Sequence, residues 1–353
     1  MTPTVISGRG LVPATLLAVA LAAPSGLTAQ TETVRLEGQE VAIWNLAGEV
    51  SVVPGDGSDV VVRVTRGGED GDRLELRTGD VEGAASLRVV YPSDRISYRP
   101  RGGFRGNTSL RVRSDGTFGG GERVEVSSSG GGMEAWADLR IEVPAGREVA
   151  VYLAVGRMEA RDVSSDLYLD THSGAVDVAG VRGRVGVDTG SGSVTVRDVE
   201  GSTNVDTGSG SVRLEGVRGD EVIVDTGSGS VTGSTVAARI VDIDTGSGEV
   251  ALTSVESADI RVDTGSGEVE LDVLRDVDRL EVDTGSGDVR VRLPSSLGAT
   301  IEMDTGSGRI DVDFPVQVRS MERTKIEGTI GDGDGYIVID TGSGSIRLLR
   351  YRS

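Results

Sequence analysis

The sequence predicts an all-β fold, a right-handed parallel β-helix (β-solenoid) with coils of 18–21 residues. Two observations predict it. The motif Asp-Thr-Gly-Ser-Gly occurs eight times, at steps of 18 to 21 residues with one final step of 36. Apolar residues also flank every copy at fixed distances. Self-similarity at a short, fixed period is typical of solenoids, in which each repeat forms one coil stacked on its neighbour.

The flanking residues indicate what each coil contains. The complete copies begin at Asp188, Asp206, Asp225, Asp244, Asp263, Asp283, Asp304 and Asp340, and an altered copy with His172 at its centre begins at Asp170. Apolar columns lie one residue before each Asp and six and eight residues after it. This period-two alternation of mostly β-branched residues predicts short strands. We expect Gly-Ser-Gly to supply the positive φ angles of a sharp corner. We also expect the Asp carboxylate to accept hydrogen bonds from the backbone N–H groups of that corner.

The first residues have the pattern of an export signal. Residues 1–29 contain Arg9, an apolar run from Leu11 to Ala23 and a cleavage point after Ala29. The run is too short to span a bilayer. The chain has no cysteine, which excludes disulfides, thiolate metal sites and a lipoprotein anchor. We therefore expect an exported protein without a membrane span, in the periplasm, on the cell surface or outside the cell.

Three further segments follow. Residues 30–66 are expected to form opening strands and a first coil, because Gly48-Glu49-Val50 copies the Gly-Glu-Val of later coils. Residues 67–138 break the rhythm and predict an irregular Gly- and Arg-rich insertion, and residues 139–353 form the β-solenoid repeat domain. Within it, residues 328–330 are expected to form a degenerate coil between the last two motif copies. Tyr351 is expected to cap the open end of the stack.

The composition restricts the partners. Without the signal, 35 basic residues face 56 acidic ones, a net charge of about −21, which argues against nucleic acid as the main ligand. Aromatic residues make up only 3% of the chain. That is too few for an ordinary globular core, but a solenoid fills its narrow interior with stacked aliphatic side chains.

The repeats and their flanks resemble a known family. The opening Asn45-Leu46-Ala47-Gly48-Glu49-Val50, the segment 139–144 and the serial Asp-Thr-Gly-Ser-Gly coils resemble the bacterial "putative adhesin" family of exported β-strand-repeat proteins, domains of unknown function. The resemblance covers residues 31–350 apart from the insertion. It implies a surface or periplasmic β-solenoid and brings no catalytic residues with it.

Two catalytic interpretations of the motif are weak. Apolar-Asp-Thr-Gly-Ser is also the catalytic loop of aspartic proteases, but those enzymes bring two aspartates face to face, not a ladder of them. Many β-helices act on glycans, yet the near-constant coil length leaves no long loops to build a site. We therefore expect no enzyme and no cofactor, with a glycan-active lyase or hydrolase as the alternative.

The stacked motif aspartates, which form a ladder along the coils, suggest one metal ligand, calcium. Stacked coils would bring successive aspartates about 4.8 Å apart, and Ca²⁺ would offset their repulsion. The candidates are Asp225, Asp244 and Asp263 in the ladder and Asp332 and Asp334 in a Gly-Asp-Gly-Asp-Gly segment. Each coil offers a single carboxylate, whereas Ca²⁺ takes six to eight oxygen ligands. Corner hydrogen bonds to each Asp are the favoured interpretation. His172, the only histidine, is expected to be a turn residue at positive φ.

The insertion offers a second candidate site. Its arginines could hold a polyanion by charge and stacking: Arg95, Arg99, Arg101, Arg105, Arg111 and Arg113. A mobile or disordered loop is the favoured interpretation, because Gly- and Arg-rich segments rarely order alone. Overall we expect a non-catalytic, exported, adhesin-like structural or surface-interaction protein. Its partner is an unidentified cell-surface or matrix ligand, with polysaccharide as one candidate.

Overall fold

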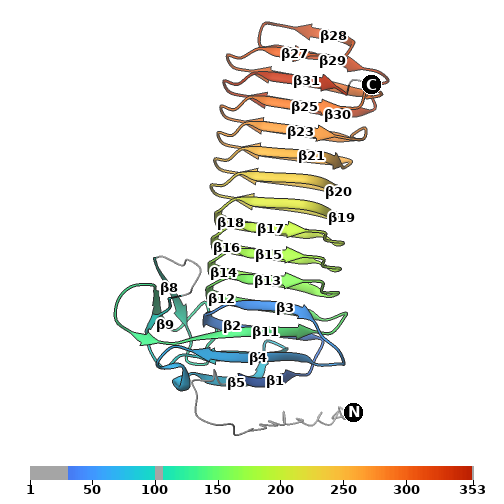
Figure 1. The fold of residues 1–353 in the computed structure, drawn as a ribbon. Helices are drawn as coiled ribbons and strands as arrows, with labels where there is room; N and C mark the ends of the chain where they lie inside the picture. The colour runs from blue at the N-terminus through green and yellow to red at the C-terminus, as the bar shows by residue number, and fades with distance from the viewer. Residues whose placement is uncertain (1–30, 100–105, 352–353) are drawn as a thin grey trace, which may run out of the picture.

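The computed structural model describes residues 31–99 and 106–351, and it confirms the predicted fold class. These residues form β-strands and one short 3-10 helix, η1 (Gly71–Arg73). Figure 1 shows a tower of stacked coils on a broader base. The predicted signal peptide lies outside the described residues. Among the residues described, no helix has the length and apolar character that membrane crossing requires.

Each coil contributes one strand to each of two facing sheets. The sheet that carries the motif aspartates is called the aspartate face, and the other the opposite face. The aspartate face contains β2 (Glu40–Ala47), β12 (Glu148–Val155), β14 (Asp166–Ser173), β16 (Val185–Ser191), β18 (Thr203–Ser209), the second halves of β19 (Val212–Thr226) and β20 (Val231–Thr245), β22 (Asp259–Thr264) and β24 (Arg279–Thr284). The opposite face contains β3 (Val50–Pro54), β13 (Met158–Arg161), β15 (Val176–Ala179), β17 (Val194–Arg197), the first halves of β19 and β20, β21 (Val250–Glu256), β23 (Val269–Val273) and β25 (Val289–Leu293).

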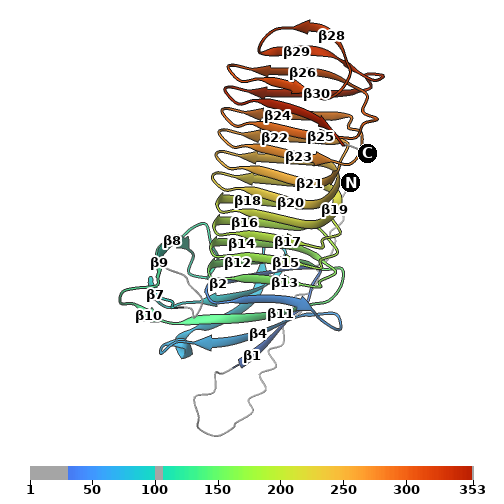
Figure 2. The same ribbon diagram turned by 45° about the horizontal axis from the view of Figure 1, so that its top comes forward.

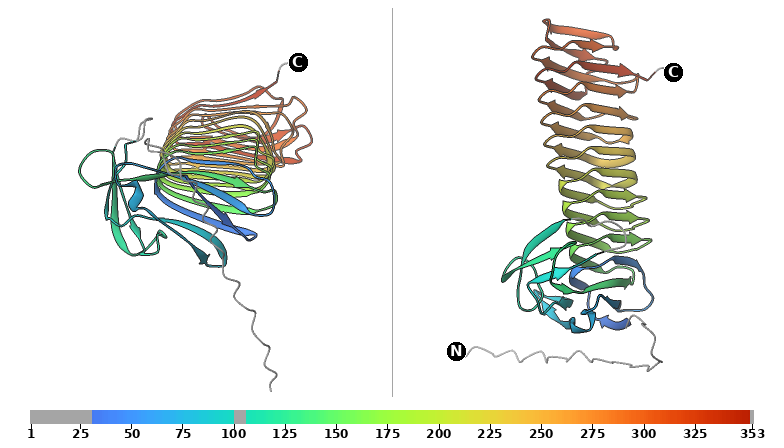
Figure 3. Two further views of the ribbon diagram at one scale, coloured as in Figure 1. Left: turned by 60° about the horizontal axis from the view of Figure 1, so that its bottom comes forward. Right: turned by 60° about the vertical axis from the view of Figure 1, so that its left-hand side comes forward.

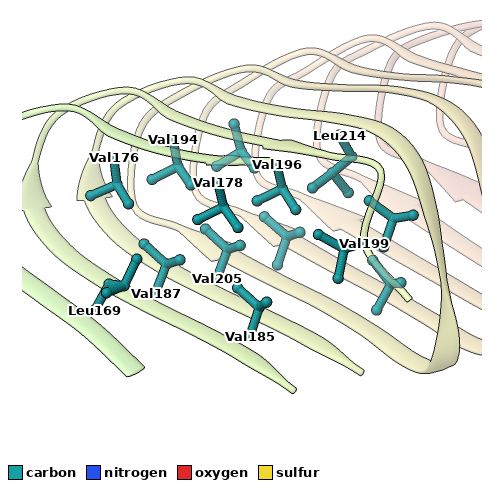
Figure 4. Packing of buried hydrophobic residues seen from close by; sticks show 14 of the residues in the cluster. Leu169, Val176, Val178, Val185, Val187, Val194, Val196, Val199, Val205 and Leu214 are labelled. Carbon is teal, nitrogen blue, oxygen red and sulfur yellow. The ribbon is translucent and has the colours of Figure 1, made fainter. Parts of the chain in front are cut away.

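All these strands are parallel and in register, so equivalent side chains stack. Val176, Val194 and Val212 are paired on successive coils of the opposite face and are fully buried. Figure 4 shows such aliphatic columns from both sheets meeting in the interior. Burying one Val or Leu side chain stabilises a fold by about 1.5–3 kcal/mol. The predicted apolar columns are therefore the core of the solenoid.

The base adds antiparallel pairing below the first coil. Strands β2 and β3 form that coil, pairing in parallel with β12 and β13. On the opposite face, β11 (Trp136–Val143) pairs in parallel with β3 and antiparallel with β4 (Val60–Gly67), which pairs with β1 (Thr31–Leu36). The sheet of the opposite face thus continues below the first coil and ends at β1.

The segment 67–138 is more regular than the sequence predicts. Its first hairpin, β5 (Glu75–Val81) and β6 (Ala84–Val90), extends the aspartate face, because β6 pairs in parallel with β2. Strands β7 (Arg95–Ser97), β8 (Asn107–Val112), β9 (Glu122–Ser127) and β10 (Met133–Glu134) form a separate four-stranded sheet beside the base. The short strands order because Ile96, Val124 and Val126 are buried in the common core.

The coils at the far end do not stack in chain order. The coil of β30 (Gly335–Thr341) and β31 (Ile346–Arg350) lies between the coil of β24 and β25 and the coil of β26 (Ala299–Thr305) and β27 (Ile310–Val312). Figure 2 shows β30 between β24 and β26. Asp340 therefore stacks between Asp283 and Asp304. The copies that stack out of chain order keep the same register as the others, Asp opposite Asp and Thr opposite Thr.

Two predictions about this end are wrong. Residues 328–330 are not a degenerate coil but part of β29 (Lys325–Ile330), which pairs antiparallel with β26 and with β28 (Val316–Met321). This hairpin covers the last coil on the aspartate face, and Figure 2 shows it beyond β26, at the end of the stack that Figure 3 shows from the side. Tyr351 caps nothing at the end of the stack. Its N–H donates to the carbonyl oxygen of Leu293, and its ring lies 6.0 Å from the Arg292 guanidinium, one coil inside.

The motif corner also differs from the prediction. The threonine, not the aspartate, bonds the corner: Thr264 Oγ1 donates to the carbonyl oxygen of Gly248 in the adjacent coil and accepts the N–H of Gly267. The aspartate points outward because it alternates with this inward threonine. Most corner glycines lack positive φ, and His172, in β14, is not among the described non-glycine residues at positive φ. The glycines are needed for space. A Cβ at Gly267 would overlap the carbonyl oxygen of Gly248.

Positive φ is found instead at the looser, second corner. The residues that adopt it lie on successive coils: Asp162, Gly180, Asp198, Gly216, Thr235 and Ser254. A Cβ at Gly216 would lie 2.8 Å from Asp198 Oδ1. The alternation of Asp and Gly in this column therefore gives each carboxylate room and separates like charges.

Candidate functional site: an aromatic and acidic trough

The outward surface of the aspartate face carries three parallel columns of side chains. Because in-register strands expose every second residue, each column gains one side chain per coil. The central column is uncharged over six coils: Ala42, Ala150, Tyr168, Gly186, Asn204 and Ile223. One flank is Glu40, Glu148, Asp166, Arg184, Ser202 and Glu221, and the other is Trp44, Tyr152, Asp170, Asp188, Asp206 and Asp225.

Three aromatic side chains begin this surface near the base. The ring of Trp44 stacks on Tyr152 at 4.9 Å and 8°, and Tyr152 meets Tyr168 at 5.9 Å and 59°. Trp44 is only 8% exposed, whereas Tyr168 is 39% exposed. Gly186 makes room for the Tyr168 ring, since a Cβ there would lie 3.0 Å from Cδ2. Tyr152 and Tyr168 therefore present apolar ring surface to solvent, supported by Trp44.

The surface is hollowed into a trough of about 520 Å³. The turn of the β5–β6 hairpin, with Val81, Glu82 and Ala84, forms one wall. The floor crosses β2, β12, β14, β16, β18 and β19, five interstrand steps of about 4.8 Å, or about 24 Å along the stack. We call this hollow the trough; it is lined by the central column, the flank from Glu40 to Glu221, Trp44, Tyr152 and the hairpin turn, and the aspartates from Asp170 to Asp225 border it. It is long enough for a chain.

The trough is strongly acidic. Five carboxylates line it, from Glu40, Glu82, Glu148, Asp166 and Glu221. Arg184 is the single basic residue among the described lining residues, and its Nη2 lies 2.8 Å from Asp166 Oδ2 and 3.6 Å from Glu148 Oε1. Arg184 is thus already paired, and the remaining charge in the trough is negative.

Asp170 lies beside Tyr152 on the neighbouring strand, and its carboxyl is partly buried. Burial, and secondly the carboxylate of Asp188 one coil away, raise the pKa of Asp170 to about 6. Burial, and then Asp170 and Asp188, raise the pKa of Tyr168 to about 12. A positive group beside them would offset the part of both pKa shifts that comes from neighbouring carboxylates.

The calcium candidates lie in two separate places. Asp225, Asp244 and Asp263 point outward from successive coils, one carboxylate each. Asp332 and Asp334 lie on the turn between β29 and β30, where the Asp334 N–H is 3.4 Å from Asp332 Oδ1. In the part of the chain described here, no three His, Cys, Asp or Glu side chains are grouped to hold a metal ion. A calcium site stays a prediction that these donors do little to support.

The arginine candidates differ in their surroundings: some form hydrogen bonds within the small sheet, and others are exposed. Arg111 donates to the carbonyl oxygen of Gly121, and Arg113 to that of Phe118, so both brace the β8–β9 hairpin. Arg95 lies on β7 beside Glu125 of β9, and Arg99 is exposed. Arg101 and Arg105 lie outside the described residues. Polyanion binding by this group stays a prediction.

Sequence reasoning missed the trough. A signal for part of it was present: Trp44 and Tyr152 occupy the position of the motif Asp in the two coils that precede Asp170. Aligning those coils on Gly48 and Gly156 would have shown aromatics continuing the aspartate column. The hairpin wall has no comparable signal, because it comes from a segment outside the repeat.

Comparison with known proteins identifies the repeat domain. Residues 122–349 match the family model described as Toastrack DUF4097. The chain belongs to the Toastrack DUF4097 family. This family is a domain of unknown function, and the match includes every motif copy.

Solved structures similar to this Toastrack protein show only distant likeness. One is described as a "putative cell adhesion protein" from Clostridium sporogenes, with 11% identity, 91% of this chain and 99% of that chain covered, and a TM-score of 0.20. Another is a "putative adhesin" from Parabacteroides merdae, with 10% identity, coverage of 91% and 95%, and a TM-score of 0.41. No curated protein matches the chain.

Proposed function

We propose that this Toastrack protein is a non-catalytic, exported, adhesin-like module that binds an extracellular ligand in the trough. One observation carries the proposal: Tyr152 and Tyr168 offer exposed ring surface inside an elongated hollow on a rigid sheet. Sites that bind organic ligands combine apolar and aromatic surface with a few polar groups that fix orientation. Sites built on strands hold that geometry better than loops do.

The shape favours a chain-like glycan over a small molecule. The trough is open along the stack, with a floor of small and aromatic residues and polar flanks. Sugar rings have apolar C–H faces that pack on aromatic rings, and hydroxyl groups that bond to side chains such as Asn204 and Ser202. These residues line the same hollow.

A glycan-active enzyme is the second candidate, because Asp170 has a raised pKa beside Asp188. Glycosidases place two carboxyl groups on opposite sides of the scissile bond. Asp170 and Asp188 instead stand side by side on neighbouring parallel strands and project from the same surface. This arrangement favours binding over hydrolysis. Mass spectrometry of glycan hexamers incubated with the protein distinguishes the two, since an enzyme would release shorter products.

The adhesin role is tested by protease treatment of cells that carry the epitope-tagged full chain. We expect the tag to be lost from intact cells, since an adhesin must reach its ligand outside. A tag protected until the outer membrane is permeabilised would overturn the adhesin role and place the protein in the periplasm.

A further inference from the structure

We propose that the trough binds an extended 1,4-linked chain of amino sugars that carry free amines. This inference rests on the proposed binding function and adds the chemical class of the ligand. It is carried by three features of the trough: the position of its charges, the spacing of its coils and the aromatic floor.

The charges select a cationic ligand. Five carboxylates and one paired arginine line the hollow. An anionic glycan would be repelled, and a neutral one would leave this repulsion unrelieved. Ammonium groups would offset it, and they also interact favourably with the faces of tyrosine rings. The central column carries no charge, so the sugar rings themselves meet uncharged surface.

The spacing matches a sugar chain lying along the stack. Neighbouring coils are about 4.8 Å apart, close to the rise of one unit in an extended β-1,4-linked chain. Each sugar would therefore meet one coil. Successive units in such a chain turn over, so their amines point alternately to the two sides. Acids stand on both sides of the central column, with Glu148 and Asp166 on one flank and Asp170 and Asp188 on the other.

The extent of the trough fixes the length of the ligand. The uncharged central column ends after Ile223, because the next outward residues of this column are Asp242 and Arg261. At the other end, the floor begins at β2, where Val81 and Glu82 of the hairpin turn form the wall. Six coils lie between these limits, so a hexamer is the natural probe.

The test measures binding of glucosamine hexamer to the full chain by calorimetry at low ionic strength and mildly acidic pH, where the amines are charged. N-acetylglucosamine hexamer and cellohexaose are the neutral controls, and hexalysine is the control for charge alone. We expect the glucosamine hexamer to bind at least about tenfold more tightly than each of the other three.

Paired variants locate the site. Tyr168→Ala, inside the trough, and Asp188→Asn, on the flank that borders it, are each expected to weaken binding of the glucosamine hexamer by about tenfold. Tyr336→Ala and Asp263→Asn are the matched controls, because Tyr336 is also an exposed tyrosine of the aspartate face and Asp263 belongs to the same column as Asp188. Both lie beyond the trough and should leave binding unchanged.

Several results would overturn the inference. Equal affinity for the acetylated hexamer would make the trough a site for neutral glycans, and equal affinity for hexalysine would make it a site for any polycation. Equal losses in trough and control variants would assign binding to the whole acidic face. Absence of binding to all four probes would remove the amino-sugar inference, while the protease experiment on cells still decides the adhesin role separately.

Discussion

At the scale of single residues, the motif threonines separate into two kinds. Thr264 Oγ1 makes two hydrogen bonds, 3.1 Å to the Gly248 carbonyl oxygen and 3.0 Å from the Gly267 N–H. Thr189 is equally buried, but its hydroxyl has no partner among the described residues. The strand ends at the threonine in the later coils but continues to the serine in β14, β16 and β18, so the corner N–H is out of reach there.

This difference predicts opposite effects of the same substitution. Thr264→Val keeps the volume but leaves two buried backbone groups unpaired, and it should destabilise the protein by about 1–3 kcal/mol. Thr189→Val removes a hydroxyl that bonds nothing and should be neutral or stabilising. Thermal melting of the two variants checks this, and equal losses would contradict the assigned hydrogen bonds.

Asp170 predicts a pH-dependent gain in stability. Its pKa is about 6 in the folded protein, raised by burial and then by Asp188, and about 3.9 in an unfolded chain. The folded state therefore binds the proton more tightly, and this group adds stability as the pH falls from about 6 to about 4. Asp170→Asn should raise the melting temperature at about pH 8 and leave it unchanged at about pH 3.5. The exposed Asp206→Asn is the control, and an equal shift at both pH values would argue against the raised pKa.

At the scale of the coil, the second glycine of each motif sets how closely coils approach. Carbonyl oxygens of one coil occupy the space where the next coil would carry a Cβ, as at Gly229, Gly248, Gly267 and Gly287. Any side chain there would push neighbouring coils apart and weaken their ladder bonds. The near-constant spacing of the coils, and hence the regular columns of the trough, depends on this row of glycines.

Gly267→Ala should therefore destabilise the solenoid by at least about 2 kcal/mol, because the added methyl overlaps backbone that cannot move alone. Gly131→Ala is the matched control, since a Cβ at Gly131 meets nothing within 4 Å. Chemical denaturation of both variants gives the comparison. A Gly267→Ala variant as stable as its control would mean that the corner can shift freely.

At the scale of the whole molecule, the row of outward aspartates invites a test for calcium. One carboxylate per coil falls short of the six to eight oxygen ligands that Ca²⁺ takes. We expect melting curves recorded with Ca²⁺ and with a chelator to coincide, with Mg²⁺ as the control for ionic strength. A higher melting temperature with Ca²⁺ alone would instead support a site on the ladder.

The order of the coils at the far end makes another prediction. A chain ending at residue 334 lacks β30 and β31, and so separates β26 and β27 from β24 and β25. Because repeats contact only their neighbours, the amides of β26 and β27 on the side of β30 and β31 should lose hydrogen-exchange protection, while those of β14, β16 and β18 keep it. Unchanged protection of 299–312 would show that β26 closes directly onto β24.

The sequence predicted the repeating part of the molecule and little beyond it. The columns around Val176 and Val194 could be aligned because each coil buries an apolar residue at the same position of the repeat. The position of Asp340 between Asp283 and Asp304 could not, since equivalent copies carry no information about their order. The trough was missed for a related reason: Trp44 and Tyr152 replace the motif residue instead of repeating it, and Glu82 comes from a hairpin without the repeat.

The displaced coil of β30 and β31 also constrains how the protein can be made. A ribosome delivers residues 299–312 before residues 335–351, yet the later segment lies beneath the earlier one. The stack therefore cannot grow coil by coil in the order of synthesis. Until β30 and β31 are made, β26 can pair only with β29 or take a provisional place on β24, so completion of this end is a late and separate step in the folding of the nascent chain.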